Sequence, residues 1–190
     1  MDALLTSTAV VALAEIGDKT QLLAILLATR FRKPWPIVAG ILFATLANHF
    51  LAALLGQQVA SLLDGQWFRL AVAVSFIAMA AWTLVPDKLD DEDGPKPARF
   101  GAFLTTLVAF FLVEMGDKTQ IATIALGAQF NAVLAVMAGT TLGMMIANVP
   151  AVFLGNAIVE QVPLKTVRIV AALLFLVIGL WLLAQTLGWI

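Results

Sequence analysis

The sequence predicts an all-α integral membrane protein whose six transmembrane helices form two inverted three-helix repeats. Three observations lead to this fold class. The chain of 190 residues is 62% hydrophobic and only 12% charged, whereas soluble domains are about half apolar and about a quarter charged. It contains six apolar segments, each near the length of about 20 residues that crosses a hydrocarbon core. Finally, the second half of the sequence repeats the first, and position 15 corresponds to position 114.

The six predicted helices follow one another with short connections and one longer, polar interruption. They lie at about residues 3–29, 35–61, 67–86, 99–128, 131–158 and 165–188. The interruption at 87–98 is rich in acids and prolines, which is typical of a solvated linker. We therefore expect a first repeat at 1–86, an acidic linker at 87–98 and a second repeat at 99–190.

The repeat is clearest at a charged motif inside the first and fourth predicted helices. Glu15-Ile16-Gly17-Asp18-Lys19-Thr20-Gln21 corresponds to Glu114-Met115-Gly116-Asp117-Lys118-Thr119-Gln120. Further matches at the same spacing include Gly40 with Gly139 and Gly56 with Gly155, and Asn48 matches Asn148 after a one-residue shift. Because each unit crosses the membrane three times, the second unit must enter from the opposite side, and this inverted arrangement is characteristic of transporters.

The basic residues predict the orientation of the chain in the membrane. Eight of the nine that lie outside the motifs are in or beside the connections after the first, third and fifth helices, and Arg69 is the exception. These eight are Arg30, Arg32, Lys33, Lys88, Lys96, Arg99, Lys165 and Arg168. By the positive-inside rule, those connections and the acidic linker are cytoplasmic and both termini lie outside.

The charged motifs need a functional explanation because a charged side chain at the bilayer centre costs about 2.5–3.5 kcal/mol. On a continuous helix Glu15, Asp18 and Lys19 would share one face, as would their counterparts in the second repeat. If the repeats face each other, the two clusters meet near the midplane. Their four carboxylates and two ammonium groups sum to a formal charge of −2, which one divalent cation or two protons would balance.

Carboxylate and amide oxygens provide a hard-oxygen environment that suits manganese, calcium or magnesium. Magnesium loses its water reluctantly, so manganese or calcium is favoured. The predicted metal ligands are Glu15, Asp18, Gln21, Glu114, Asp117 and Gln120, with Lys19, Thr20, Lys118, Thr119, Asn48 and Asn148 as secondary candidates. No cofactor is expected, since the metal ion is the substrate. Cysteine is absent and His49 is the single histidine, so zinc and copper are disfavoured, and we interpret His49 as a packed or interfacial residue rather than a ligand.

Several alternatives remain open at this stage. Glu15 could pair with Lys19, and Glu114 with Lys118, as structural ion pairs four residues apart. Gly17 and Gly116 could break their helices and free carbonyl groups, or could allow close helix packing. The two asparagines could instead form hydrogen bonds between helices.

The sequence is also compatible with two other classes of protein. The paired glycine-aspartate sequences allow an intramembrane aspartyl protease, and a membrane scaffold that transports nothing is a third hypothesis. The net charge of −1 and the lack of a basic patch give no indication of nucleic-acid binding. The expected partners are therefore a divalent metal ion and the lipid bilayer.

The paired motifs resemble those of the manganese and calcium cation/proton exchangers, a family defined by two Glu-x-Gly-Asp-(Lys/Arg)-(Thr/Ser) motifs. Both are intact here, at Glu15–Thr20 and Glu114–Thr119. The resemblance implies that Glu15, Asp18, Glu114 and Asp117 carry the cation. The short chain is similar to the bacterial branch, which implies manganese efflux across the inner membrane, and calcium/proton exchange is the alternative. The mechanism expected from the repeat is alternating access driven by protons rather than enzyme catalysis.

Overall fold

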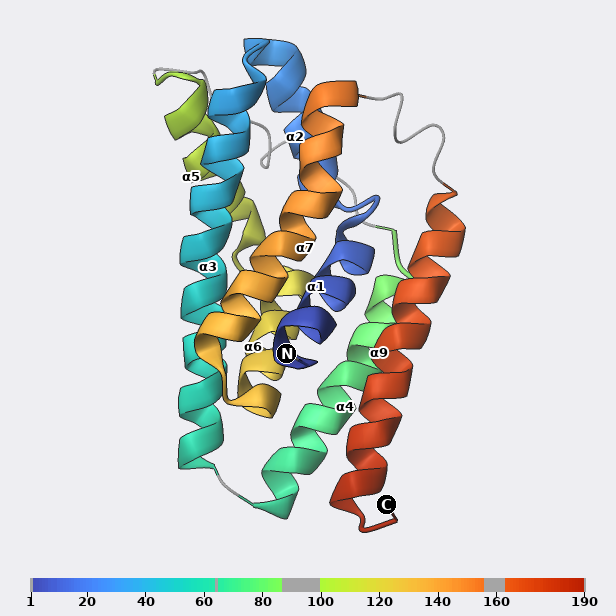
Figure 1. The fold of residues 1–190 in the computed structure, drawn as a ribbon. Helices are drawn as coiled ribbons and strands as arrows, with labels where there is room; N and C mark the ends of the chain where they lie inside the picture. Colours follow the sequence, from blue (N-terminus) through green and yellow to red (C-terminus); the bar gives the residue numbers. More distant parts are fainter. Residues whose placement is uncertain (1, 64, 87–99, 156–162, 190) are drawn as a thin grey trace.

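The structure, a computed structural model, describes residues 2–63, 65–86, 100–155 and 163–189. The regular elements in these ranges are all helices (Figure 1). They are α1 (Asp2–Glu15), α2 (Lys19–Phe31), α3 (Pro34–Leu62), α4 (Gln66–Thr83), α5 (Ala102–Glu114), α6 (Lys118–Phe130), α7 (Val133–Leu154) and α9 (Leu164–Thr186). The predicted linker at 87–98 and the last residues of the fifth predicted helix, 156–158, lie outside the described residues.

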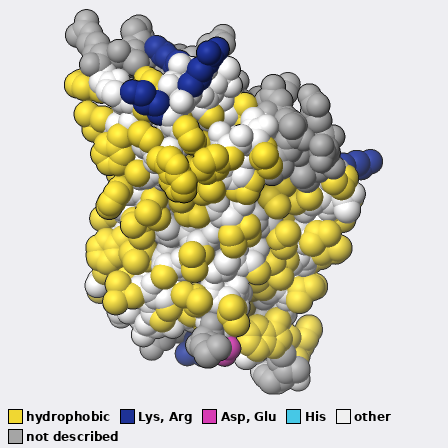
Figure 2. All heavy atoms as spheres, turned by 45° about the horizontal axis from the view of Figure 1, so that its top comes forward, with side chains coloured by type: hydrophobic (Ala, Val, Ile, Leu, Met, Phe, Trp, Pro, Cys, Tyr) yellow, Lys and Arg dark blue, Asp and Glu magenta, His cyan; other side chains and the backbone are white. Residues whose placement is uncertain are grey.

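Four of these helices are long and apolar enough to cross a membrane: α3, α4, α7 and α9. Their apolar side chains are only partly covered by the rest of the protein, and between 28% and 50% of the residues in their most apolar windows are buried. On the face shown in Figure 2, hydrophobic side chains predominate in the middle, and several Lys and Arg side chains gather at the top, with others at the right edge and the bottom. The helical, multi-pass membrane class predicted from composition is therefore confirmed.

The first and fourth predicted helices are each broken into two shorter helices at the charged motif. The segment expected at 3–29 consists of α1 and α2, and the segment expected at 99–128 consists of α5 and α6. The continuous helix assumed for each motif is thus wrong. The break falls at Gly17 (φ 80°) and Gly116 (φ 79°), a backbone conformation that favours glycine because it has no Cβ.

The two open interpretations of these glycines are separated by their surroundings. A Cβ added at Gly116 would meet no atom within 4 Å in the described part of the chain, so close helix packing does not explain this glycine. A Cβ at Gly17 would approach the flexible tip of Leu164 at 2.7 Å. Because both residues have a positive φ, the helix break explains both of them.

The two halves of the chain pack against each other through contacts that occur twice with the halves exchanged. Gly40 on α3 lies against α5, where an added Cβ would be 2.8 Å from Phe103 O. Gly139 on α7 lies against α1 in the same way, 2.5 Å from Leu4 O. Gly40 corresponds to Gly139 and Leu4 to Phe103 in the sequence repeat. Each of these contacts therefore joins a helix of one half of the chain to a helix of the other half.

The direction of the broken helices differs between the halves. In Figure 1 the chain rises through α1 and α2 and descends through α5 and α6. The end of α2, the start of α5 and the end of α7 lie at one end of the bundle, and the start of α4 and the C-terminus lie at the other. Beside them, α4 and α9 pack on each other along their length, with Phe76 and Phe175 6.2 Å apart between ring centroids.

The helices that follow the two breaks, α2 and α6, pack to different extents on their neighbours α7 and α3. α6 packs much more extensively on α3 than α2 packs on α7. A Cβ at Gly127 on α6 would lie 2.5 Å from Ala53 O on α3, so the two helix backbones are nearly in contact. Gln57 Nε2 also donates to Asn131 Oδ1 (2.6 Å) and to Asn131 O (3.2 Å). We call this contact between α3 and α6, made by Ala53, Gln57, Gly127 and Asn131, the glycine clasp.

Candidate metal site

The helix breaks place the motif carboxylates at helix ends. Glu15 and Glu114 are the last residues of α1 and α5, and Asp18 and Asp117 precede the first residues of α2 and α6 as their N-caps. A helix N-terminus stabilises a nearby negative charge, and a C-terminus stabilises a positive one. The aspartates are therefore stabilised by their helices, whereas the glutamates add negative charge where a cation is already favoured.

Three of the carboxylates converge although they come from both halves of the chain. Glu15, Glu114 and Asp117 each present one oxygen, and the three oxygens lie within 4.8 Å of one another. Glu15 and Glu114 are completely buried, and Asp117 is 5% exposed. Oε1 of each glutamate has no hydrogen-bond partner among the described residues. Buried carboxylates at this spacing require a compensating positive charge.

Both lysines of the motifs cross to the opposite half of the chain. Lys19 Nζ lies 3.3 Å from Asp117 Oδ1, and Lys118 Nζ lies 2.5 Å from Asp18 Oδ1. The ion pairs considered within one helix, Glu15 with Lys19 and Glu114 with Lys118, are not the pairs found, because the break separates each glutamate from the following lysine. In these two pairs, each lysine lies beside the aspartate of the other motif.

The motif threonines bind the glutamates. Thr20 Oγ1 donates to Glu15 Oε2 at 2.5 Å, and Thr119 Oγ1 lies 3.2 Å from Glu114 Oε2 and 3.1 Å from Asp117 Oδ2. Both threonines are completely buried. These hydroxyls fix the orientation of each glutamate across its helix break and leave Oε1 for another partner.

The motif glutamines brace the breaks rather than join the three carboxylates. Gln21 Oε1 accepts from Gly17 N at 2.9 Å, and Gln120 Oε1 accepts from Gly116 N at 2.7 Å. Their amide groups donate across the chain halves, from Gln21 to Ala147 O and from Gln120 to Asn48 Oδ1. Both glutamines are predicted ligands, but the structure gives their side-chain carbonyl oxygens a hydrogen-bonding role.

The helices α3 and α7 supply the remaining polar side chains near the motifs. Asn48 accepts from Gln120 and donates to Phe111 O at 3.4 Å, as expected for a bond between helices. Asn148 donates to Met144 O within its own helix, and its Oδ1 has no hydrogen-bond partner in the described chain. The two glutamines contact Asn48 and Ala147, which correspond without any shift, so the one-residue shift that paired Asn48 with Asn148 is wrong.

The unshifted register pairs Asn148 with His49. The sequence predicts that His49 is a packed or interfacial residue rather than a ligand. His49 is completely buried on α3, and its Nε2 lies 3.8 Å from Glu114 Oε2. It is packed, as predicted, but it is packed against the acidic cluster. The signal was in the sequence, because the single histidine occupies the position that the second half fills with a candidate asparagine.

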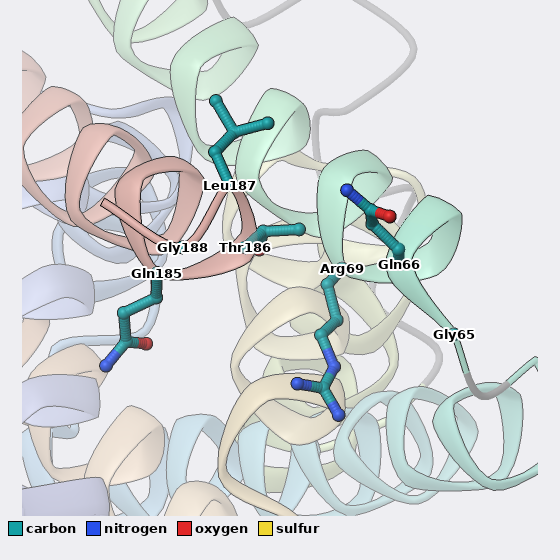
Figure 3. Close-up of a pocket in the computed structure, with 7 residues that line it drawn as sticks. All are labelled: Gly65, Gln66, Arg69, Gln185, Thr186, Leu187 and Gly188. Carbon is teal, nitrogen blue, oxygen red and sulfur yellow. The ribbon is translucent and has the colours of Figure 1, made fainter. Parts of the chain in front are cut away.

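A separate cavity of about 340 Å³ lies where α4 begins and α9 ends (Figure 3). The described residues that line it include the cation Arg69 and no carboxylate, a lining that does not suit a divalent cation. The lining residues are Gly65, Gln66, Arg69, Gln185, Thr186, Leu187 and Gly188. The described side chains that do suit such a cation are the three converging carboxylates.

Comparison with known protein families fits this chemistry. The sequence model of the family described as divalent cation/proton antiporter GDT1 matches residues 3–91 and 102–189. This chain belongs to the GDT1 family. The family resemblance inferred from the paired motifs is therefore confirmed, and GDT1 proteins are transporters of divalent cations rather than enzymes. The protease hypothesis is excluded by this membership.

Relatives of this GDT1 protein occur in bacteria and plants. A Vibrio cholerae protein named "Putative manganese exporter" is 52% identical over 181 residues, which cover 95% of this chain and 90% of the relative. The GDT1-like protein sll0615 of Synechocystis is 31% identical, with 87% and 88% covered. GDT1-like protein 3 of Arabidopsis thaliana is also 31% identical and covers 92% of this chain and 68% of the relative. No solved structure matches the chain.

Proposed function

We propose that this GDT1 protein exports manganese(II) from the bacterial cytoplasm in exchange for protons, by alternating access at a midplane site. The convergence of Glu15, Glu114 and Asp117 within 4.8 Å, deep between apolar helices, carries the proposal. The name of the 52% identical Vibrio cholerae relative supports manganese as the ion. In this proposal the acidic linker at 87–98 is cytoplasmic and both termini are outside.

The charges around the site support one divalent cation as its occupant. The two crossed Lys–Asp pairs balance Asp18 and Asp117. Two negative charges then remain, on Glu15 and Glu114, and a dication or two protons would balance them. In this proposal protons occupy the two glutamates when no cation is bound, and an arriving cation displaces them. Asp18, Gln21 and Gln120 complete the proposed site by holding its geometry.

The inverted repeat at 1–86 and 99–190 provides the proposed conformational change. The opposite chain directions of α1–α2 and α5–α6, and the exchanged glycine contacts, support two halves related by a two-fold axis. The glycine clasp closes the side on which α6 lies, which is the outer side in the proposed orientation. Opening it while closing α2 onto α7 would expose the site to the other side of the membrane.

Metal transport into inside-out vesicles tests this function. We expect manganese to enter when the vesicle interior is acidic and uptake to collapse when the gradient is dissipated. Glu114→Gln and Asp117→Asn should abolish uptake, and Asp2→Asn, which changes an exposed carboxylate in the same way, should not. Manganese flux that ignores the proton gradient would reject proton exchange, and calcium uptake in place of manganese uptake would support the calcium alternative.

A further inference from the structure

His49 is an anomaly among the buried side chains. It is 0% exposed, and neither ring nitrogen has a hydrogen-bond partner among the described residues. A neutral imidazole carries one donor and one acceptor, and buried polar groups are nearly always satisfied. An unsatisfied imidazole inside a membrane protein therefore calls for a partner that the described residues do not supply.

The position of His49 indicates which partner that is. Its Nε2 lies 3.8 Å from Glu114 Oε2, which is too long for a hydrogen bond. Two atoms that ligate one metal ion at about 2.2 Å lie roughly 3.1 Å apart at a right angle and roughly 4.4 Å apart in line. The observed separation falls between these values. One ion bound by Glu114 through Oε2, the oxygen that also accepts from Thr119, can thus reach His49. The His49 nitrogens lie outside the group of Glu15, Glu114 and Asp117 oxygens that come within 4.8 Å of one another, so the ion would sit toward the Glu114 side of that group.

We infer that His49 is a nitrogen ligand of the transported ion and that it makes the site select transition-metal dications, manganese(II) among them, over calcium and magnesium. This inference rests on the proposed function of the carboxylate cluster. Calcium and magnesium bind oxygen ligands, whereas transition-metal dications also accept imidazole, manganese(II) less strongly than the later metals of the series. Three carboxylates alone would accept all of these ions, so the imidazole supplies the discrimination that the acidic motifs lack.

The internal repeat shows that this ligand is specific to one half. The position equivalent to His49 is Asn148, whose buried Oδ1 also lacks a hydrogen-bond partner in the described chain. An amide oxygen there suits any of the candidate ions. The two halves therefore present the same carboxylates and threonines, but one half adds an imidazole nitrogen and the other an amide oxygen.

The nitrogen ligand can be detected directly because the chain has a single histidine. Purified full-length protein without a polyhistidine tag would be loaded with manganese(II) and studied by pulsed electron paramagnetic resonance. We expect nitrogen modulation from the ion, and we expect its frequency to change when histidine labelled with ¹⁵N in the ring is incorporated. This measurement needs no substitution, so it does not depend on a variant that folds.

Substitutions then measure selectivity. His49→Gln keeps the side-chain reach but offers an amide oxygen, so we expect manganese affinity to fall about 10- to 100-fold while calcium affinity is maintained. Calcium should then compete with manganese for uptake into inside-out vesicles. His49→Leu, which keeps the apolar volume without a ligand, should weaken manganese binding and gain no calcium competition.

The outcomes separate this inference from the proposed function. If Glu114→Gln abolishes manganese binding but the wild-type ion shows no histidine nitrogen, the carboxylate site stands and the role of His49 is rejected. An unchanged manganese-to-calcium ratio in His49→Gln rejects it as well. If Glu114→Gln binds manganese as well as the wild type does, the proposed site itself fails, and the inference about His49 fails with it.

Discussion

Lys118 Nζ lies 2.5 Å from Asp18 Oδ1, an ion pair that joins the first residue of α6 to the N-cap of α2. Its counterpart, Lys19 with Asp117, joins the same two half-helices with the roles exchanged at 3.3 Å. Each motif therefore neutralises the aspartate of the other. The lysine of each motif is thus needed by the aspartate of the other motif, which explains why both copies carry a lysine at the same position.

The Lys118–Asp18 pair should be the more important of the two for stability. Its side chains are 5% and 0% exposed, whereas Lys19 is 20% exposed. Lys118→Gln should lower the free energy of unfolding by about 3–5 kcal/mol, because removing one partner leaves a buried charge without its counter-ion. Lys19→Gln should cost less, since Lys19 is less buried. Thermal unfolding in detergent compares the two variants.

A double-mutant cycle provides the control for this prediction. Lys118→Gln combined with Asp18→Asn removes both charges, so the double variant should be less destabilised than the sum of the two single variants. Additive effects would show that the 2.5 Å contact contributes no coupling. The same cycle on Lys19 and Asp117 should give a smaller coupling energy.

The helix breaks should not tolerate a side chain, even where there is space for one. Gly116→Ala meets no steric obstacle in the described structure, yet the residue has a φ of 79°. We expect a loss of stability of about 1 kcal/mol or more, with a lower transport rate, because alanine disfavours this backbone conformation. Gly101→Ala is a suitable control, since its φ is −64° and a Cβ there also meets nothing within 4 Å.

The threonine that holds Glu15 should affect metal affinity more than folding. Thr20→Val keeps the side-chain shape but removes the hydroxyl that donates to Glu15 Oε2. We expect the KM for manganese uptake to rise about 10- to 100-fold, as for other groups that orient a metal ligand. Thr20→Ser should retain most of the affinity. Thr29→Val, which changes a hydroxyl bonded to Ile25 O on the same helix, should leave the KM unchanged.

The glycine clasp should open during transport, and the absence of cysteine from the chain makes this easy to test. Cysteines introduced at Gln57 and Asn131 would be joined by a short, reducible thiol cross-linker. Joining α3 to α6 should stop manganese transport, and reduction should restore it. A cross-link between positions 57 and 61, both on α3, should have no effect. Full transport by the cross-linked 57–131 variant would contradict the proposed role of this contact.

Much of the fold could be predicted because its causes are local. Apolar length and repeated motifs indicate helices wherever they occur, and α3, α4, α7 and α9 lie where the sequence places them. The break at Gly17 was one of two interpretations, since glycine in an apolar helix serves equally for close packing. Only the surroundings of the residue, and its φ, decide between the two.

The site was harder to predict because its contacts cross between the halves. Periodicity on one helix pairs Glu15 with Lys19, but the ammonium group lies beside Asp117. Likewise, the glutamine side chains could serve as metal ligands, but their oxygens accept hydrogen bonds from the backbone N–H groups of Gly17 and Gly116. Those N–H groups are available only because the helices break, which the sequence does not reveal. His49 was set aside because it does not repeat, although the structure places it beside Glu114.

The glycine joints at residues 17 and 116 determine how little the protein must deform to function. Each of the half-helices beyond them, α2 and α6, has 13 residues. A rigid rod of that size is about 20 Å long, so a tilt of about 15° at its base swings the far end by about 5 Å. Tilting α2 and α6 as rigid helices at these glycines could thus admit an ion without unwinding either helix. Because the glycines lie next to the metal site, the bound ion itself would move little.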